Sequence, residues 1–250
     1  MTQRKLGSIL SPPAALISLI ILPTLQATAA TLVIYGASGQ IGDFIVTEAL
    51  SRGHEVIGVS RNPDGMTTDH PNFSAVAGDA TNLDSMLEII PDADAVIFSL
   101  SGVGPGNTPA EATTVRAAAT FIQASNQLRD AAPRAVQVGG GTTLRINGVL
   151  GLDNLDVEEG TPRHGQYYGH WLALETYQAS TGVKWTIITP PPGIMEPGER
   201  TGEYRLGDEE VLFNAEGEMA ISTRDLAVAI VDEAESGQSM GTRVAVGPPY

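Results

Sequence analysis

The sequence contains no cysteine and, among its 250 residues, only two lysines. Without cysteine no thiol can mispair in an oxidising compartment, so the chain is compatible with export. Lysine and arginine together number 14, against 29 aspartates and glutamates, and the formal net charge is -15. Binding to nucleic acid needs clustered cations that neutralise phosphates, so this charge balance argues against a nucleic-acid partner. Solubility explains the excess of acid better than an acidic functional surface does.

The apolar run near the N-terminus is too short to span a bilayer, which takes roughly 20 residues. This run, Ala14–Leu25, follows the basic pair Arg4–Lys5 and precedes the small residues Ala27–Ala30. The three-part order predicts a secretory signal over the first 30 residues, cleaved near Ala29 or Ala30. We therefore expect a periplasmic or secreted protein with no stable membrane span after cleavage. An uncleaved membrane anchor and a cytoplasmic extension are the alternatives.

A strand, a glycine-rich turn and a helix follow one another over residues 31–52. Leu32–Ile34 is a short apolar run, typical of a strand buried on both faces of a parallel sheet. Glycines stand at positions 36, 39 and 42, and Asp43–Arg52 has the pattern of an amphipathic helix. The first glycine permits a tight turn, the second lets the backbone approach a pyrophosphate, and the third lets the helix pack on the strand. Because the amides at the helix N-terminus face the anion, the stretch predicts a dinucleotide phosphate site.

Beyond this unit, apolar runs of strand length alternate with helical patterns to the end of the chain. The alternation predicts an α/β fold, a doubly wound (Rossmann), mostly parallel sheet of seven strands with helices on both faces. We expect residues 31–250 to form one domain, with substrate-side elements over about 143–170 and 190–220. The further strands are expected at His54–Ser60, Phe73–Gly78, Asp94–Ser99, Arg134–Gly139, Val183–Thr189 and Thr242–Val246. The further helices are expected from near Leu83 and at Thr108–Ala131, Gln166–Ser180 and Thr223–Glu235.

Two regions between these elements are less regular. Residues 145–166 lack a clear period, although Asp153–Glu159 is strongly acidic. We interpret this region as an excursion over the site and as a solvated loop rather than a metal cluster, because metal ligation needs converging carboxylates. Pro190–Gly193 ends regular structure sharply. Glu203–Leu206 and Glu210–Phe213 then predict two short strands, a small ribbon beside the main sheet in the C-terminal lobe.

The end of the second predicted strand bears on the choice of nucleotide. An NAD-specific site carries Asp or Glu there, to accept a hydrogen bond from the ribose 2′-hydroxyl. This chain has Ser60 and Arg61 instead, and a guanidinium with a serine suits a 2′-phosphate. The position therefore favours NADPH over NADH, although Arg61 is also compatible with a solvated loop. Asp79, after the third strand, either meets the adenine amino group or caps the helix near Leu83.

Six stretches spread over the chain carry a likeness to a known superfamily: Tyr35–Gly42, Val59–Pro63, Gly78–Ala80, Val138–Gly140, Trp185–Pro190 and Glu196–Gly202. They resemble the short-chain dehydrogenases/reductases, and within them the atypical NAD(P)H-binding branch of NmrA-like and flavin or biliverdin reductase-like proteins. The likeness covers nearly everything after Ala30. It implies a seven-stranded Rossmann sheet with a substrate pocket over its carboxyl edge.

The resemblance also implies roles for individual residues. The pyrophosphate contacts would come from Gly36, Ser38, Gly39, Gln40, Ile41 and Gly42. Arg61 would bind the 2′-phosphate, and Asp79 with Ala80 would border the adenine. The central part of the cofactor would be lined by Ser99, Leu100, Ser101 and Gly102. The nicotinamide and the substrate would face Gly140, Gly141 and Thr142.

The sequence departs at one point from the better-known members, which place Tyr and Lys four residues apart on a helix. Aligning Tyr168 with that tyrosine puts Leu172 at the lysine position, and neither lysine of the chain is available for the role. Tyr168 with Thr142 or Thr143 could still donate hydrogen bonds to a carbonyl. His170 could supply a proton, since an unperturbed imidazole titrates near neutrality. All of these side chains are also compatible with structural roles, in packing the helix or capping a turn.

The sequence therefore predicts an NAD(P)H-dependent oxidoreductase that prefers NADPH and reduces a small organic, flavin or quinone-like acceptor. A flavin or quinone needs little acid catalysis, because hydride can pass directly between stacked rings. That would make the absence of the Tyr–Lys pair tolerable. The alternative is a non-catalytic NAD(P)-binding sensor or interaction protein of the NmrA-like type. An NAD(P)-dependent epimerase is less favoured, because such enzymes usually keep the Tyr and the Lys.

Overall fold

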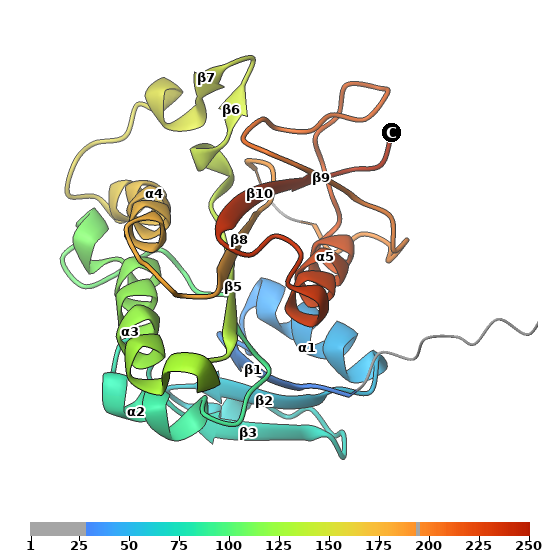
Figure 1. Cartoon of the computed structure of the whole chain (residues 1–250). Coiled ribbons are helices and arrows are strands. Elements are labelled where there is room, and N and C mark those ends of the chain that lie inside the picture. The colour runs from blue at the N-terminus through green and yellow to red at the C-terminus, as the bar shows by residue number, and fades with distance from the viewer. Residues whose placement is uncertain (1–28, 194–195) are drawn as a thin grey trace, which may run out of the picture.

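The computed structural model describes residues 29–193 and 196–250, so most of the predicted signal segment lies outside the described residues. The centre of the fold is an eight-stranded sheet in the order β3-β2-β1-β4-β5-β8-β10-β9 (Figure 1). Its strands are β1 (Thr31–Tyr35), β2 (Glu55–Ser60), β3 (Phe73–Ala77), β4 (Ala95–Phe98), β5 (Arg134–Val138), β8 (Trp185–Thr189), β9 (Arg205–Gly207) and β10 (Thr242–Gly247). The α-helices are α1 (Gln40–Ser51), α2 (Leu83–Ile89), α3 (Thr113–Leu128), α4 (Pro162–Gln178) and α5 (Thr223–Ser236). Short 3-10 turns occur at Pro63–Gly65, Pro109–Glu111, Arg129–Ala131, Gly141–Thr143 and Gly151–Asn154.

The order of the strands confirms the predicted doubly wound Rossmann fold. From β1 the chain moves outward through β2 to β3, returns to β4 on the other side of β1, and continues outward through β5 and β8. The direction of winding therefore reverses between β1 and β4. Ligands of open α/β sheets bind at such a switch point, outside the carboxyl ends of the strands. The fold thus places the candidate site above the ends of β1 and β4.

The predicted count of seven strands is one too few, because the segment expected in a separate ribbon joins the main sheet. β9 pairs antiparallel with β10, with Leu206 opposite Val246, while the other neighbouring strands run parallel. Glu210–Phe213 forms no strand, and Glu210 makes only an isolated bridge with Arg145. The region expected to be irregular contains a two-stranded sheet of β6 (Arg145–Ile146) and β7 (Val149–Leu150). These short pairings depend on partners that a local sequence pattern does not reveal.

Helices cover both faces of the sheet, as the alternating pattern predicts. α1 and α5 lie on one face, and α2, α3 and α4 on the other (Figure 1). Within β1, Leu32 and Ile34 belong to the first of these cores, and Val33 and Tyr35 to the second. All four side chains are at most 1% exposed, and burying one of this size contributes about 1.5–3 kcal/mol. The central strand therefore holds the turn that follows it in a fixed place.

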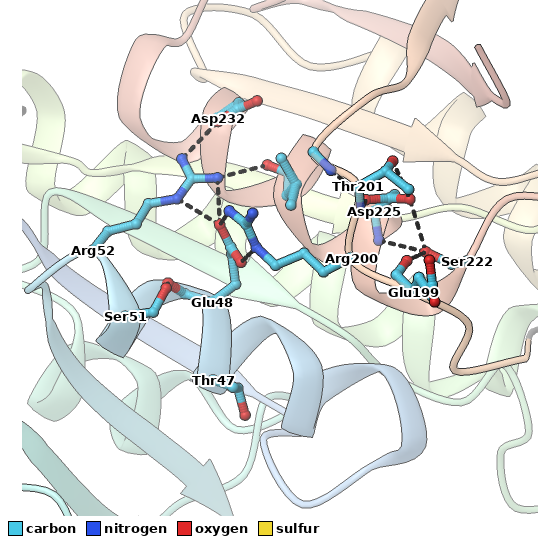
Figure 2. A network of polar contacts seen from close by, with 12 residues as sticks. Thr47, Glu48, Ser51, Arg52, Glu199, Arg200, Thr201, Ser222, Asp225 and Asp232 are labelled. Atoms are coloured by element: carbon cyan, nitrogen blue, oxygen red, sulfur yellow. Dashed lines mark hydrogen bonds and ion pairs between the residues drawn. The ribbon is translucent and has the colours of Figure 1, made fainter.

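A network of charged groups joins α1 to α5 and to the segment before β9 (Figure 2). The Glu48 carboxylate accepts hydrogen bonds from Arg52 at 2.8 Å and from Arg200 at 2.6 and 2.7 Å. Arg52 continues to Asp232 at 2.6 Å and to Glu235 at 3.0 Å, both on α5. Glu48 is only 4% exposed, so this carboxylate would be costly to bury without its partners.

We expect Glu48→Gln to lower the free energy of unfolding by about 2 kcal/mol, because two guanidinium groups lose their shared carboxylate. Hydrogen bonding by Arg200, against the opposing effect of burial, holds the pKa of Glu48 below its ordinary value. This stabilisation is therefore present above the ordinary carboxyl pKa and is lost as pH falls through the folded-state pKa. Urea unfolding should show the difference between variant and wild type at about pH 7 and a smaller one at about pH 3. Glu88→Gln, at an exposed position of α2, is the control, and an equal effect there would contradict the expectation.

Candidate cofactor and substrate site

The turn after β1 has the geometry that its three glycines predict. The amide of Gly39 donates to the carbonyl of Gly36 at 2.9 Å, and Gly36 has a φ of +82°, which favours glycine. A Cβ at Gly36 would lie 2.1 Å from the carbonyl oxygen of Ser99, at the end of β4. A Cβ at Gly42 would lie 2.0 Å from the carbonyl oxygen of Gly36. The first glycine therefore lets β1 pass close to β4, and the third lets α1 pack on the turn.

The N-terminus of α1 is open toward this turn. Gly39 is its N-cap residue, and no side chain caps the helix there. The first amides of a helix lack intrahelical acceptors, and with the helix dipole they form a site for a negatively charged group. Gly39 lines both of the cavities described below. The turn thus fits the pyrophosphate of a dinucleotide.

A cavity of about 790 Å³ extends from this turn along the carboxyl ends of β2, β3 and β4. Its predicted lining residues are Gly36, Ser38, Gly39, Ser60, Arg61, Asp79, Ala80, Ser99, Leu100 and Ser101. Residues that sequence reasoning did not place there are Tyr35, Val59, Thr81, Val103, Gly104, Pro105, Thr113 and Arg116. Thr113 and Arg116 lie on the first turn of α3, so their position depends on how that helix packs on the sheet. The cavity suits the adenosine half of a dinucleotide.

Asp79 lies in this cavity with its carboxylate held in place. Its Oδ1 accepts hydrogen bonds from the amide and the hydroxyl of Thr81, both at 2.8 Å. Partial burial opposes the charge, but these bonds and the charges of Arg116 and Arg61 outweigh it and lower the pKa of Asp79. The helix cap that sequence reasoning left open for Asp79 is provided instead by Asn82, which accepts from the amide of Ser85. Asp79 is thus an anionic acceptor at the edge of the cavity.

A second cavity, of about 590 Å³, continues from the first and shares Gly39, Ser99, Leu100 and Ser101 with it. The predicted residues Gln40, Ile41, Gly140, Gly141, Thr142 and His170 line it. Further lining residues are Val138, Gly139, Gln166, Tyr167, Pro190, Pro191, Pro192 and Gly193. None of these side chains is charged, so the described part of this cavity suits a neutral group.

The run of glycines after β5 lets the walls of the second cavity approach each other. A Cβ at Gly140 would lie 2.7 Å from Cγ of His170, and one at Gly141 would lie 2.4 Å from the backbone nitrogen of Pro192. Behind the turn, the Thr143 hydroxyl donates to the carbonyl of Gly140 at 2.7 Å. The buried Arg243 donates to the carbonyl of Thr143 at 2.7 Å. Thr143 is therefore occupied within the protein and supports the turn from outside the cavity.

Two polar atoms of the second cavity are buried without a hydrogen-bond partner among the described residues, Oγ1 of Thr142 and Nδ1 of His170. Orphaned buried polar atoms are rare and indicate a missing ligand or water. Burial lowers the pKa of His170 to about 4, so its imidazole is neutral at pH 7. An imidazole with this pKa does not titrate near neutrality, so that reason for proton donation by His170 is wrong, and its part in catalysis stays a prediction. A neutral imidazole and a threonine hydroxyl can still exchange hydrogen bonds with a ligand.

The low pKa of His170 makes folding stability depend on pH. The imidazole binds a proton near pH 6.5 when unfolded but only near pH 4 when folded, so the stability present above pH 6.5 falls between these values. We expect wild type to lose about 3 kcal/mol of folding stability across this range and the variant His170→Gln to show no such loss. Urea unfolding of both proteins at a series of pH values measures it. Parallel stability curves for the two proteins would contradict the expectation.

Besides Thr143, three predicted residues lie outside the two cavities. Gly42 packs against Gly36, and a Cβ at Gly102 would lie 2.8 Å from the carbonyl oxygen of Gln166. The Tyr168 ring packs against that of His164 at a tilt of 37°, with ring centroids 4.7 Å apart, and Tyr167 is the tyrosine that lines the second cavity. Adjacent residues of a helix point about 100° apart, so only the packing of α4 decides which one faces the cavity.

The glycine turn, the open helix end and the two joined cavities define a dinucleotide-binding Rossmann protein. A sequence profile of the NAD(P)H-binding family matches residues 36–236. The chain therefore belongs to this NAD(P)H-binding family and, as its motifs indicate, to the atypical branch of the short-chain dehydrogenases/reductases.

Several solved structures are similar to the chain over nearly their whole length. A proposed epimerase from Bacteroides thetaiotaomicron is 29% identical and has a TM-score of 0.74, covering 89% of this chain and 98% of its own. A proposed NADH-flavin reductase from Streptococcus pneumoniae TIGR4 is 27% identical, with a TM-score of 0.71 and coverages of 88% and 100%. A proposed exported protein from Burkholderia pseudomallei is 27% identical, with a TM-score of 0.69 and coverages of 87% and 99%.

Proposed function

We propose that this protein is an NADPH-preferring reductase of a small neutral acceptor, a flavin or quinone-like ring. The observation that carries the preference is Arg61, whose exposed guanidinium lines the adenosine cavity and makes no hydrogen bond or ion pair with described residues. Ser60 precedes it, and no Asp or Glu stands at the end of β2 to accept from a 2′-hydroxyl. A dianionic 2′-phosphate is the natural partner of such a guanidinium.

The second cavity supports a neutral, planar acceptor. When bound, a nicotinamide cofactor supplies the hydride, and the protein must orient it and exclude water. Gly140 and Gly141 add no side chain to the cavity, and Pro191 and Pro192 pack directly beside Gly141. Thr142 and the neutral His170 can each form a hydrogen bond with a polar group of the acceptor, and neither side chain has to gain or lose a proton to do so. Since hydride can pass directly between stacked rings, such a reaction does not need the catalytic lysine that the better-known members of the superfamily have.

The proposal is tested by two measurements on the purified protein. Calorimetry should show binding of NADPH, and NADPH should be oxidised in the presence of members of a panel of flavins, quinones and carbonyl compounds. Absence of NADPH binding to the folded protein would overturn the proposal, whatever the acceptor.

Two variants distinguish the roles of the adjacent tyrosines Tyr167 and Tyr168 of α4 in turnover. Tyr167 lines the second cavity, and we expect Tyr167→Phe to lower turnover about tenfold through loss of one hydrogen bond to the acceptor. Tyr168→Phe is matched in chemistry and should leave turnover within about twofold, because Tyr168 packs on His164. Steady-state NADPH oxidation measures both. A larger effect at Tyr168 would return the catalytic role to the residue that aligns with the superfamily tyrosine.

The second candidate is a non-catalytic sensor that binds NAD(P)H. It is favoured by Leu172, which stands where the better-known members of the superfamily have the catalytic lysine. Both candidates require nucleotide binding, so only turnover distinguishes them. Oxidation of NADPH by any acceptor in the panel, lowered by Tyr167→Phe, would exclude the sensor.

We also propose export with cleavage near Ala29 or Ala30. The Ala30 amide donates to Nδ1 of the buried His54 at 3.1 Å, and the Ala30 carbonyl accepts from Glu55 at 2.9 Å. Cleavage after Ala29 would keep both hydrogen bonds, so the predicted cleavage site coincides with the start of the fold. Among the residues that the structure describes, no helix has the length and apolar character to cross a membrane. N-terminal sequencing of the protein from its host tests the proposal, and a retained first segment would overturn it.

A further inference from the structure

The adenosine cavity contains a second arginine that the proposed function does not use. Most arginines of the described chain donate hydrogen bonds or form ion pairs, namely Arg52, Arg134, Arg145, Arg200, Arg205, Arg224 and Arg243. Arg61, Arg116, Arg129 and Arg163 do neither with described residues, although acidic residues outnumber basic ones by 29 to 14, and of these four arginines Arg61 and Arg116 line the adenosine cavity. Asp79 in the same cavity feels both charges, but the two guanidinium groups keep their hydrogen-bond donors available to an electron-rich ligand.

Arg116 reaches the cavity from a different element than Arg61. It lies on the first turn of α3, three residues after Thr113, so the two side chains share one face of the helix. Thr113 also lines the cavity, and its hydroxyl donates to the carbonyl of Val103 at 2.8 Å. This bond fixes the wall beside Arg116. Arg61 instead directly follows β2, so the two guanidinium groups approach the ligand from separate sides.

Asp79 shows which end of the nucleoside each arginine faces. It follows β3 in the same cavity, and as an anionic acceptor it suits the amino group of adenine. The charges of both arginines act on its carboxylate, and that of Arg116 acts more strongly. The amino group of adenine and the 2′-position of its ribose lie at opposite ends of the nucleoside. Arg61 follows β2, whose carboxyl end faces the 2′-position of the ribose, so Arg116, which enters the same cavity from α3, is assigned to the base end.

Two nearly buried residues form part of the floor of the cavity that Arg116 also lines. Tyr35 and Ala80 both line the cavity, and they are 1% and 5% exposed. The Tyr35 ring is fixed by stacking on Phe98, with ring centroids 5.3 Å apart, and its buried hydroxyl has no partner among the described residues. A planar base can lie over this floor with its opposite face toward Arg116.

We infer that Arg116 binds the adenine ring itself, by stacking its planar guanidinium on the base, while Arg61 binds the 2′-phosphate. Arginine stacks on aromatic faces, and such contacts contribute to binding of either nucleotide, because NADH and NADPH carry the same base. The inference deepens the proposed function and rests on it, since it takes NADPH as the ligand. Affinity for the base and selectivity for the phosphate are then supplied by two different arginines.

The experiment compares Arg116→Gln and Arg61→Gln by calorimetry with NADPH, NADH and ADP-ribose. We expect Arg116→Gln to weaken all three by the same factor, about tenfold. Arg61→Gln should weaken NADPH alone, because neither NADH nor ADP-ribose carries a 2′-phosphate. Arg116→Lys, which keeps the charge but not the planar group, should recover only part of the loss. Arg129→Gln is the control, since Arg129 is exposed at the far end of α3, and it should bind all three ligands like wild type.

Three results would overturn the inference while leaving the proposed function intact. Loss of NADPH affinity alone in Arg116→Gln would make Arg116 a second phosphate ligand. Wild-type affinity for all three ligands would leave it without a role in binding. Full recovery by Arg116→Lys would replace stacking by simple charge attraction and would contradict the assigned contact. Failure of the wild-type protein to bind any of the ligands would instead overturn the proposed function.

Discussion

Arg61→Asp should invert the nucleotide preference of this protein. We expect the affinity for NADPH to fall by about a hundredfold, because the phosphate loses a charge-assisted hydrogen bond and meets a like charge. The affinity for NADH should rise severalfold at the same time, because a carboxylate at the end of β2 can accept from the ribose 2′-hydroxyl. Arg61 is exposed and makes no hydrogen bond or ion pair with described residues, so losing its attraction to the Asp79 carboxylate should lower the unfolding temperature by only about 1–2 °C.

Calorimetric titration with both nucleotides measures the inversion. Arg129→Asp makes the same change of net charge on an exposed residue at the far end of α3, and it should leave both affinities within about twofold. Equal losses of affinity for NADPH and NADH in Arg61→Asp would show that Arg61 does not distinguish the two nucleotides. This result would contradict the proposed preference for NADPH.

Gly36→Ala is expected to have the largest effect on folding and binding together. The added Cβ would lie 2.1 Å from the carbonyl oxygen of Ser99, so the ends of β1 and β4 must move apart. The φ of +82° adds strain for a residue with a side chain. We expect the free energy of unfolding to fall by about 3 kcal/mol and NADPH binding to fall by at least about a hundredfold. Urea unfolding and calorimetry measure the two effects.

Alanine substitutions at two other glycines distinguish the effect of backbone strain from the effect of a changed turn on nucleotide binding. Gly53 has a φ of +84° and nothing within 4 Å of an added Cβ, so Gly53→Ala should cost about 1 kcal/mol and leave NADPH binding unchanged. Gly39 has a φ of −81°, and its added Cβ would meet only the carbonyl oxygen of Gly36, at 3.1 Å. Gly39→Ala should therefore fold but bind NADPH weakly, because it narrows the approach to the open end of α1. Unchanged binding in Gly39→Ala would argue against a pyrophosphate at this turn.

The first unit of the fold is predictable because its signals are local. The apolar run of β1, three glycines at fixed spacing and the amphipathic pattern of α1 all lie within residues 31–51. Arg61 is predictable for a similar reason, since it directly follows a strand whose carboxyl end must lie at the site. The alternation of strands and helices then determines a parallel sheet, because parallel neighbours need crossover connections.

Other parts of the site depend on contacts between distant elements. Residues Tyr167 and Tyr168 are adjacent and of the same type, so no sequence pattern decides which one faces the second cavity. The pKa of His170 depends on its burial, and not on its neighbours along the helix. Arg116 enters the adenosine cavity only because α3 packs beside α2, and β9 joins the main sheet only because β10 offers a free edge.

The sequence by itself determined the Rossmann fold class, the glycine turn after β1 and the place of Arg61 at the carboxyl end of β2, because each rests on short-range periodicity and on residues that follow a strand directly. Tertiary structure alone decided which tyrosine of α4 lines the second cavity, the lowered pKa of His170 and the position of Arg116 in the adenosine cavity. It also decided the contact of Glu48 with Arg200, 152 residues away. The physical reason is that side-chain direction, burial and ion pairing are set by packing between elements, which no local stretch of sequence contains.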